Sequence, residues 1–314
     1  MTLRVALARY LEARKDLSPK STAGYRRSVE RYLKPWLDLP LREITGDMIE
    51  ERHRSIKREL DRGNDQDGSV KVTGEATANG VMRAFRLLWN FVAERDPDLP
   101  PNPVRRLRKG WYHVARRERM VRPDQLPAFY AAVDALPSRT AVDYIKLLLF
   151  TGLRRNEAAA LLWEEIDFAE RVIRLPAKRT KARRKLDLPM SDFVRNMLVA
   201  RRALGRDGPF VFPADSRSGH LTEPKFPLAQ VARDTGIAIS AHDLRRTYTT
   251  VAEGTDISPL ALKALVNHSL GNDVTSGYVI ATVDRLREPA QRVGDRLKDL
   301  CGIAAIEGAV KKLG

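Results

Sequence analysis

The chain has 314 residues and a formal net charge of +16, with 56 Lys and Arg against 40 Asp and Glu. A charge this far from zero attracts polyanions, so nucleic acid is the first expected partner and a membrane surface the second. The membrane interpretation is weak, because no apolar run approaches the roughly 18–20 residues of a span and no signal peptide follows Met1. The single cysteine, Cys301, excludes an intramolecular disulfide and a cysteine-built zinc site.

The first hundred residues predict a bundle of four amphipathic helices. Apolar residues recur at helical spacing in four stretches, 3–11, 25–36, 49–60 and 81–92. Ser18-Pro19 and Thr45 are start signals for the second and third helices. The stretch 62–75 is rich in Gly, Asp and Ser and predicts a loop. Four prolines within 97–103 end this first domain, residues 1–103.

A basic segment, 104–122, follows the bundle and is interpreted as a linker between two domains. It contains eight Lys or Arg and one acidic residue, Glu118. Such a run is either a solvated surface or a segment that lies along a phosphate backbone. On the second interpretation its DNA-binding residues are Arg105, Arg106, Arg108, Lys109, Arg116 and Arg117.

Residues 123–300 predict a second domain of mixed α+β structure, so the whole chain is expected to be mainly α with a small β-sheet. Two strands of a hairpin are predicted at 172–175 and 185–188. Helices are predicted at 123–136, 141–151, 191–204, 224–235, 243–253, 258–266 and 284–300. The tail, 301–314, predicts a small amphipathic helix that packs on its own domain or docks on a neighbouring subunit.

Two arginines in the second domain have neighbours that suggest phosphate chemistry. Arg154 follows Thr151-Gly152-Leu153, and Arg245 lies in His242-Asp243-Leu244-Arg245-Arg246. A guanidinium is always charged and donates two parallel hydrogen bonds to phosphate oxygens. Two such groups stabilise the extra negative charge of a phosphodiester under attack.

The candidates for proton transfer and nucleophilic attack are two histidines and a tyrosine. His242 shares a helical face with Arg245, and an imidazole accepts and donates protons near neutrality. Tyr278 follows His268 by ten residues. A phenol has a pKa of about 10, which nearby cations lower, so Tyr278 is a candidate nucleophile. The alternative for each is a structural role.

The predicted hairpin carries a basic turn that includes Arg179, Lys181, Arg183 and Arg184. One interpretation is a ribbon that only binds DNA, and the other is that a lysine of the turn protonates a departing oxygen. Motifs for zinc proteases, nucleotide-binding loops and cysteine-bound metals are absent from the sequence. Neither a metal nor any other cofactor is therefore expected.

Together these motifs resemble the tyrosine recombinase family, in particular the phage-type integrases. The resemblance covers nearly the whole chain and is strongest from Thr151 to Tyr278. It implies that Arg154 and Arg245 bind the scissile phosphate, and that His242 and His268 assist proton transfer. It further implies that Lys181 is the general acid, that Glu157 supports the site as a buried acid, and that Tyr278 attacks to give a 3′-phosphotyrosine.

Two features depart from the usual family pattern. The step from His268 to Tyr278 is one residue longer than is common, and Val266-Asn267-His268 replaces the frequent Leu-Gly-His. The resemblance assigns residues 1–103 to a core-binding domain that would hold duplex DNA together with the catalytic domain, 123–300. No arm-binding domain is evident ahead of it, so the chain is either naturally short or truncated.

The expected function is therefore a site-specific recombinase of a mobile element. Its expected partners are double-stranded DNA, further copies of the chain in a tetramer, and accessory DNA-bending or directionality factors, within the cytoplasm at the bacterial nucleoid. Two alternatives stay open at this point. One is a relaxase similar to type IB topoisomerases, and the other is a non-catalytic DNA-binding regulator of recombinase descent.

Overall fold

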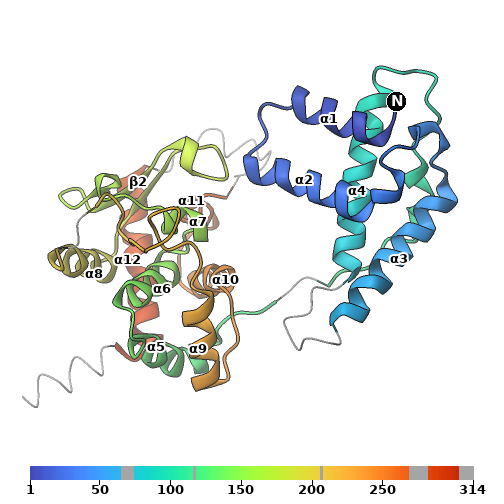
Figure 1. Ribbon diagram of the computed structural model, residues 1–314. Helices are drawn as coiled ribbons and strands as arrows, with labels where there is room; N and C mark the ends of the chain where they lie inside the picture. Colours follow the sequence, from blue (N-terminus) through green and yellow to red (C-terminus); the bar gives the residue numbers. More distant parts are fainter. Residues whose placement is uncertain (65–73, 116–117, 206–207, 269–281, 304–314) are drawn as a thin grey trace, which may run out of the picture. The chain divides into compact units, whose positions relative to one another are not determined.

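The chain divides into two units, Met1–Arg117 and Glu118–Gly314, and each is described by itself (Figure 1). The computed structural model describes residues 1–64, 74–115, 118–205, 208–268 and 282–303. Within these ranges, no helix combines the length and the apolar character that crossing a bilayer requires.

In the described residues of the first unit, four α-helices pack around a shared apolar core. They are α1 (Leu3–Ala13), α2 (Pro19–Tyr32), α3 (Gly46–Asn64) and α4 (Gly74–Ala93), with short 3₁₀ turns η1 (Lys34–Trp36) and η2 (Leu41–Glu43). The predicted start signals are confirmed, because the Ser18 hydroxyl accepts from the Ser21 amide and the Thr45 hydroxyl from the Met48 amide. α4 buries Phe85 in the core.

Part of the segment expected to be a linker belongs to the first unit. Pro103–Lys109 forms the 3₁₀ helix η3, which packs on α3 and α4 because Val104 and Leu107 are buried. Further on, the Asn79 side chain donates to the Tyr112 carbonyl (2.8 Å) and accepts from the Tyr112 amide (3.3 Å). The division between the units falls after Arg117.

The second unit is built around α6 (Arg139–Thr151), a helix buried on nearly all sides from Thr140 to Thr151. α12 (Val283–Leu300) packs against α6 and against α8, α10 and α11. The remaining helices are η4 (Pro123–Gln125), α5 (Leu126–Asp134), α7 (Arg155–Ala159), η5 (Trp163–Glu165), η6 (Ala177–Arg179), α8 (Asp192–Ala203), α9 (Lys225–Thr235), α10 (Ala241–Glu253) and α11 (Pro259–Leu265).

A small antiparallel sheet completes this unit, in the order β1 (Ile166–Asp167), β2 (Val172–Leu175) and β3 (Leu186–Pro189). In its register Ile173 lies opposite Ile166 on one side and Leu188 on the other. The predicted hairpin is thus confirmed, as is the fold class, mainly α with a small sheet. The turn between β2 and β3 carries the basic residues named above, Arg179, Lys181, Arg183 and Arg184.

Gly152 ends α6 in a conformation that other residues rarely adopt. Its φ is +62°, and a Cβ there would lie 2.4 Å from Cδ1 of Tyr248. We expect Gly152→Ala to lower the free energy of unfolding by about 2–5 kcal/mol, the sum of roughly 1–2 for the left-handed backbone and roughly 1–3 for overpacking. Urea denaturation measures this loss.

Gly236 is the matched control for that substitution. It ends α9 at a φ of +74°, yet a Cβ there would meet nothing within 4 Å. Gly236→Ala should therefore cost only the backbone contribution, about 1–2 kcal/mol. Equal losses in the two variants would contradict a close contact between Gly152 and Tyr248.

Candidate active site

Arg154 stands at the start of α7, directly after the turn that ends α6. The carboxylate of Glu157 accepts from the Arg154 backbone amide (3.1 Å) and from its Nη1 (3.0 Å). Glu157 is only 2% exposed, while the Arg154 side chain is 23% exposed. One buried carboxylate therefore both caps the helix and orients a guanidinium that is itself partly exposed.

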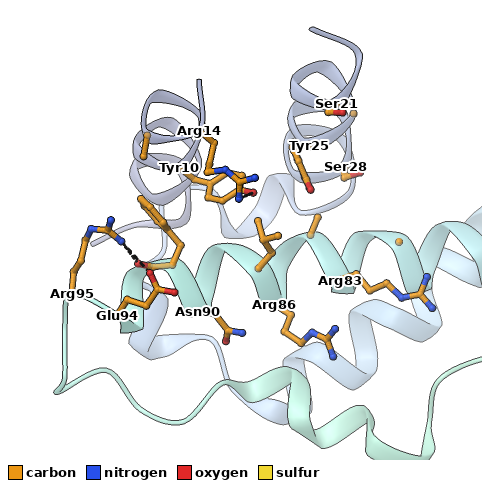
Figure 2. Close-up of a pocket in the computed structure, with 16 residues that line it drawn as sticks. Tyr10, Arg14, Ser21, Tyr25, Ser28, Arg83, Arg86, Asn90, Glu94 and Arg95 are labelled. Atoms are coloured by element: carbon orange, nitrogen blue, oxygen red, sulfur yellow. Dashed lines mark hydrogen bonds and ion pairs between the residues drawn. The ribbon is translucent and has the colours of Figure 1, made fainter. Parts of the chain in front are cut away.

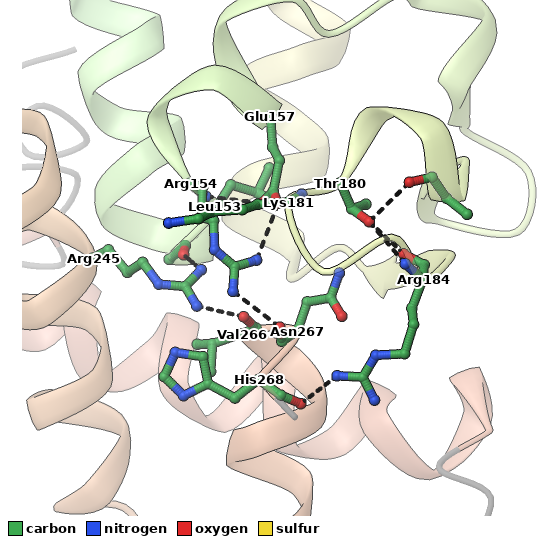
Figure 3. Close-up of polar contacts among 12 residues, drawn as sticks. Leu153, Arg154, Glu157, Thr180, Lys181, Arg184, Arg245, Val266, Asn267 and His268 are labelled. Carbon is green, nitrogen blue, oxygen red and sulfur yellow. Dashed lines mark hydrogen bonds and ion pairs between the residues drawn. The ribbon is translucent and has the colours of Figure 1, made fainter. Parts of the chain in front are cut away.

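Backbone carbonyls of the turn after α11 hold both candidate arginines. Arg245, on α10, donates from Nη1 to the Gly152 carbonyl (2.7 Å) and from Nη2 to the Val266 carbonyl. Arg154 donates from Nη2 to the Asn267 carbonyl (3.1 Å). Figure 3 shows the two guanidinium groups side by side on this turn. The structure thus brings together two arginines that are far apart in the sequence.

Asn267 gives this turn its shape. It is buried and has a φ of 47°, in the left-handed region. Asparagine tolerates this conformation better than most non-glycine residues, which accounts for an asparagine where the related motif has glycine. Arg183, in the basic turn, also has a positive φ (52°). Backbone strain of this kind tends to gather at functional sites.

The two arginines make the site unfavourable for positive charge and favourable for an anion. Burial, and then the charge of Arg154, lowers the pKa of Arg245 to about 10. Even so, Arg245 keeps its charge at neutral pH, so two like charges are held together at a partly dry site. A phosphodiester bound there would relieve this repulsion, and its oxygens would accept hydrogen bonds from further N–H groups of the two guanidinium groups.

Both candidate histidines are held in the neutral form near pH 7. Burial is the first cause that lowers the pKa of His242, and the charges of Arg246, Arg245 and Lys181 lower it further against the opposing effect of Asp243. Burial, then Arg245 and Arg154, lowers the pKa of His268. A neutral imidazole accepts a proton, as the deprotonation of a phenol requires.

The pH dependence of cleavage follows from these directions. The rate at low DNA concentration reports on groups of the free enzyme, so it should fall on acidification only below the ordinary histidine pKa of about 6.5. His242→Gln should remove or displace this acidic limb. An acidic limb centred above pH 6.5 in the unaltered protein would contradict a lowered pKa. The same shifts stabilise the fold above pH 6.5, and that contribution is lost as pH falls through the lowered pKa values.

Lys181 lies in the turn between β2 and β3, which reaches the same site. Its backbone amide donates to Oε1 of Glu157 (3.4 Å). The hydroxyl of Thr180 donates to the Arg184 carbonyl (2.6 Å) and accepts from the Arg184 amide (3.1 Å), which closes the turn around Lys181. Arg184 in turn donates from Nη2 to the His268 carbonyl (2.9 Å).

Six of the predicted site residues therefore gather at one place: Arg154, Glu157, Lys181, His242, Arg245 and His268. Tyr278 lies outside the described residues, as do Arg116, Arg117 and the tail from 304 onward. Among the residues that are described, no group of three or more His, Cys, Asp or Glu side chains is placed to hold a metal ion.

Besides Arg184, two further residues of the predicted DNA-binding set are engaged within the protein. Arg179 pairs with the buried carboxylate of Glu165 (3.1 Å) and donates to the Glu157 carbonyl (3.2 Å), so it supports the site from behind. Arg106 lies within ion-pair distance of Asp47 and Glu50 on α3. Arg105 and Arg108 instead line an open groove beside α4.

The first unit carries a second candidate surface, a groove of about 880 Å³ between α1, α2 and α4 (Figure 2). Arg83 and Arg86 of α4 are among its lining residues, and their guanidinium groups also approach the Trp111 ring, at 5.7 and 6.0 Å. Arg86 also lines the neighbouring groove that holds Arg105 and Arg108. Basic and aromatic side chains together are typical of nucleic-acid surfaces.

The sequence predictions missed several contributors. Arg83 and Arg86 could have been found, because they lie on the face of α4 away from the apolar residues at helical spacing. The carbonyls of the turn 266–268 had no such signal, since every residue has a backbone carbonyl. The role of Thr180 had no such signal either, because it closes the turn through a contact with a residue four positions away.

Comparison with known proteins gives consistent matches. The model of the phage integrase family matches residues 119–284. The chain is 25% identical over 282 residues to prophage integrase IntF of Escherichia coli K12, covering 85% of this chain and 56% of that protein. It is 28% identical over 306 residues to tyrosine recombinase XerD of Corynebacterium glutamicum, covering 89% and 93%. The chain spans about half the length of the prophage integrases it matches.

Solved structures show the same fold at low identity. The Tn1549 transposon integrase in complex with transposon right end DNA matches with a TM-score of 0.69 at 19% identity, covering 93% of this chain and 99% of that chain. A lambda integrase (75–356) dimer bound to a COC' core site matches with a TM-score of 0.64 at 18% identity, covering 86% and 96%.

Proposed function

Because the chain belongs to the phage integrase family, we propose that it is a site-specific DNA recombinase that cuts and rejoins duplex DNA through a 3′-phosphotyrosine at Tyr278. The observation that carries this proposal is the pair of guanidinium groups, Arg154 and Arg245, held on one turn beside two neutral imidazoles. This arrangement suits an attacked phosphodiester better than a neutral substrate.

In the proposed reaction the Tyr278 oxygen attacks the scissile phosphorus, and the bond from phosphorus to the 5′ oxygen breaks. His242 accepts the phenolic proton, and Lys181 gives a proton to the departing 5′ oxygen. Arg154 and Arg245 bind the non-bridging oxygens, whose negative charge grows in the transition state. The phosphotyrosine retains the energy of the phosphodiester, so a 5′ hydroxyl of another strand can reverse the step without ATP.

DNA binding would involve both units. The first unit, with the α4 grooves and the residues Arg105 and Arg108, would act as a core-binding domain, and the segment up to residue 122 would follow the DNA to the catalytic domain. Because many phosphates would be contacted, affinity should fall steeply with salt. Solved relatives are complexes with transposon and core-site DNA, which supports double-stranded DNA as the partner.

Higher-order assembly belongs to the same proposal. A lambda integrase tetramer bound to a Holliday junction has this fold, which supports a tetramer on two DNA sites. In this proposal, residues 301–314 dock on a neighbouring copy and accessory factors assist the reaction. The protein acts at the nucleoid, on a prophage or another mobile element.

A plasmid assay tests the function. Two candidate attachment sites, taken from the DNA that flanks the gene, are placed on one plasmid, and a second plasmid carries a single site. We expect deletion or inversion of the segment between two sites and little relaxation of the single-site plasmid. Relaxation of both plasmids without recombinants would point to a topoisomerase-like enzyme, and tight binding without strand cleavage to a regulator.

A further inference from the structure

We propose that Arg184 is a positioning residue for the cleavage step: its bond to the His268 carbonyl holds the turn that carries Lys181 against the arginine pair. The inference rests on the proposed function and assigns a task to a residue so far considered only for DNA binding. Its basis is the hydrogen bond from Arg184 to the His268 carbonyl, a contact that the reaction chemistry does not itself require.

Three consecutive carbonyls of the turn after α11 accept from three different arginines. Val266 accepts from Arg245, Asn267 from Arg154 and His268 from Arg184. We call these carbonyls the carbonyl row. Figure 3 shows the guanidinium of Arg184 reaching the row from the turn between β2 and β3.

Arg184 is well placed to act on Lys181 because the turn between them is closed. The Thr180 hydroxyl bonds both the amide and the carbonyl of Arg184, which ties the two ends of the segment 180–184 to each other. The Lys181 amide lies 3.4 Å from Glu157, at the long end for a hydrogen bond. Each bond has one charged partner, but the bond from Arg184 to His268 is shorter, 2.9 Å, and lies within the ordinary range for a hydrogen bond.

Loss of this tie should affect one step of the reaction. Arg154 and Arg245 would keep their own bonds to the row, so phosphate binding would persist. Lys181 would lose its fixed position relative to the phosphate, and protonation of the 5′ oxygen would slow. A displacement of about 1 Å costs up to roughly 10²-fold in rate.

The test uses a DNA substrate whose scissile 5′ oxygen is replaced by sulfur. A thiol has a pKa of about 8.5, far below that of an alcohol, so a thiolate departs without a general acid. Single-turnover cleavage at saturating DNA is compared on the oxygen and sulfur substrates for the full chain and for Arg184→Gln, Arg184→Lys and Lys181→Gln. Lys185→Gln is the charge-matched control, since Lys185 is exposed and pairs with Asp187 (2.9 Å) rather than with the row.

We expect Arg184→Gln to be slowed by roughly 10–10²-fold on the oxygen substrate and to match the unaltered protein on the sulfur substrate. Lys181→Gln should show the same pattern with a larger loss, roughly 10²–10⁴-fold. Arg184→Lys, which can still donate one hydrogen bond to His268, should recover part of the rate. Lys185→Gln should resemble the unaltered protein on both substrates.

Two results would overturn the inference. Slow cleavage by Arg184→Gln on both substrates would mean that Arg184 acts on the phosphate itself or on the fold, which thermal unfolding separates. Unchanged cleavage on both would mean that the tie does not matter. Failure of the unaltered protein to cleave either substrate would instead reject the proposed function, and the inference with it.

Discussion

Replacing Arg245 by lysine is expected to slow DNA cleavage by roughly 10²–10³-fold, the range for loss of one preorganised donor to a developing negative charge. Lysine keeps the charge, but it cannot bond the Gly152 and Val266 carbonyls and also present parallel N–H groups to phosphate as the planar guanidinium does. Single-turnover formation of the covalent adduct at saturating DNA measures the effect without a contribution from affinity.

Arg246 provides the control for this substitution. It is the next residue of α10, and it donates to the Arg119 carbonyl (2.9 Å) and to Asp243 (3.3 Å), away from the carbonyl row. Arg246→Lys should therefore change the rate far less than Arg245→Lys. A similar rate in both variants, or a rate for Arg245→Lys close to that of the unaltered protein, would show that the guanidinium of Arg245 is not required.

Replacing Glu157 by alanine is expected to cost both stability and activity. Breaking a buried ion pair by removing one partner costs about 3–5 kcal/mol. The loss here should lie near or below the lower figure, because the side chain of Arg154 is 23% exposed. Arg154 would also lose its orientation, and the Lys181 amide its acceptor. Cleavage should fall by roughly 10²-fold as the donors are displaced, measured at a temperature where the variant is fully folded.

A substitution at Glu165 separates the loss of stability from the loss of activity. It too is a buried carboxylate that caps its own helical turn, through the Leu162 amide, and pairs with an arginine, Arg179. Glu165→Ala should therefore lower the free energy of unfolding by a comparable amount, with a much smaller loss of cleavage rate. If the two variants lost activity in equal proportion, the effect of Glu157 would be one of stability alone.

The helices were predictable where local signals agree. Ser18-Pro19 starts a helix in the sequence and in the structure, because a cap and a fixed proline φ act within one turn. The strand Val172–Leu175 was found because an apolar run flanked by polar residues is typical of a hairpin strand. β1 was missed, since a strand of two residues carries no periodic signal.

The structure of the segment 104–122 was harder to predict, because its many charged residues concealed the signal of its buried apolar residues. Arg105, Arg106, Arg108 and Lys109 suggested an exposed run, yet Val104 before them and Leu107 among them pack on α3 and α4. Arg154 and Arg245 were predictable from their motifs. What holds them was not, since the Asn267 carbonyl lies 113 residues from Arg154 and a backbone atom has no residue-type signature.

The most direct test of the proposed chemistry is to trap the covalent intermediate. A substrate nicked near the cleavage point loses its short 5′-hydroxyl fragment and cannot be resealed, so the adduct accumulates. Digestion and mass measurement should place the DNA on the peptide that contains Tyr278, joined through a 3′ phosphate, and Tyr278→Phe should form none. An adduct that persists in Tyr278→Phe, or a tyrosine joined to a 5′ phosphate, would contradict the account.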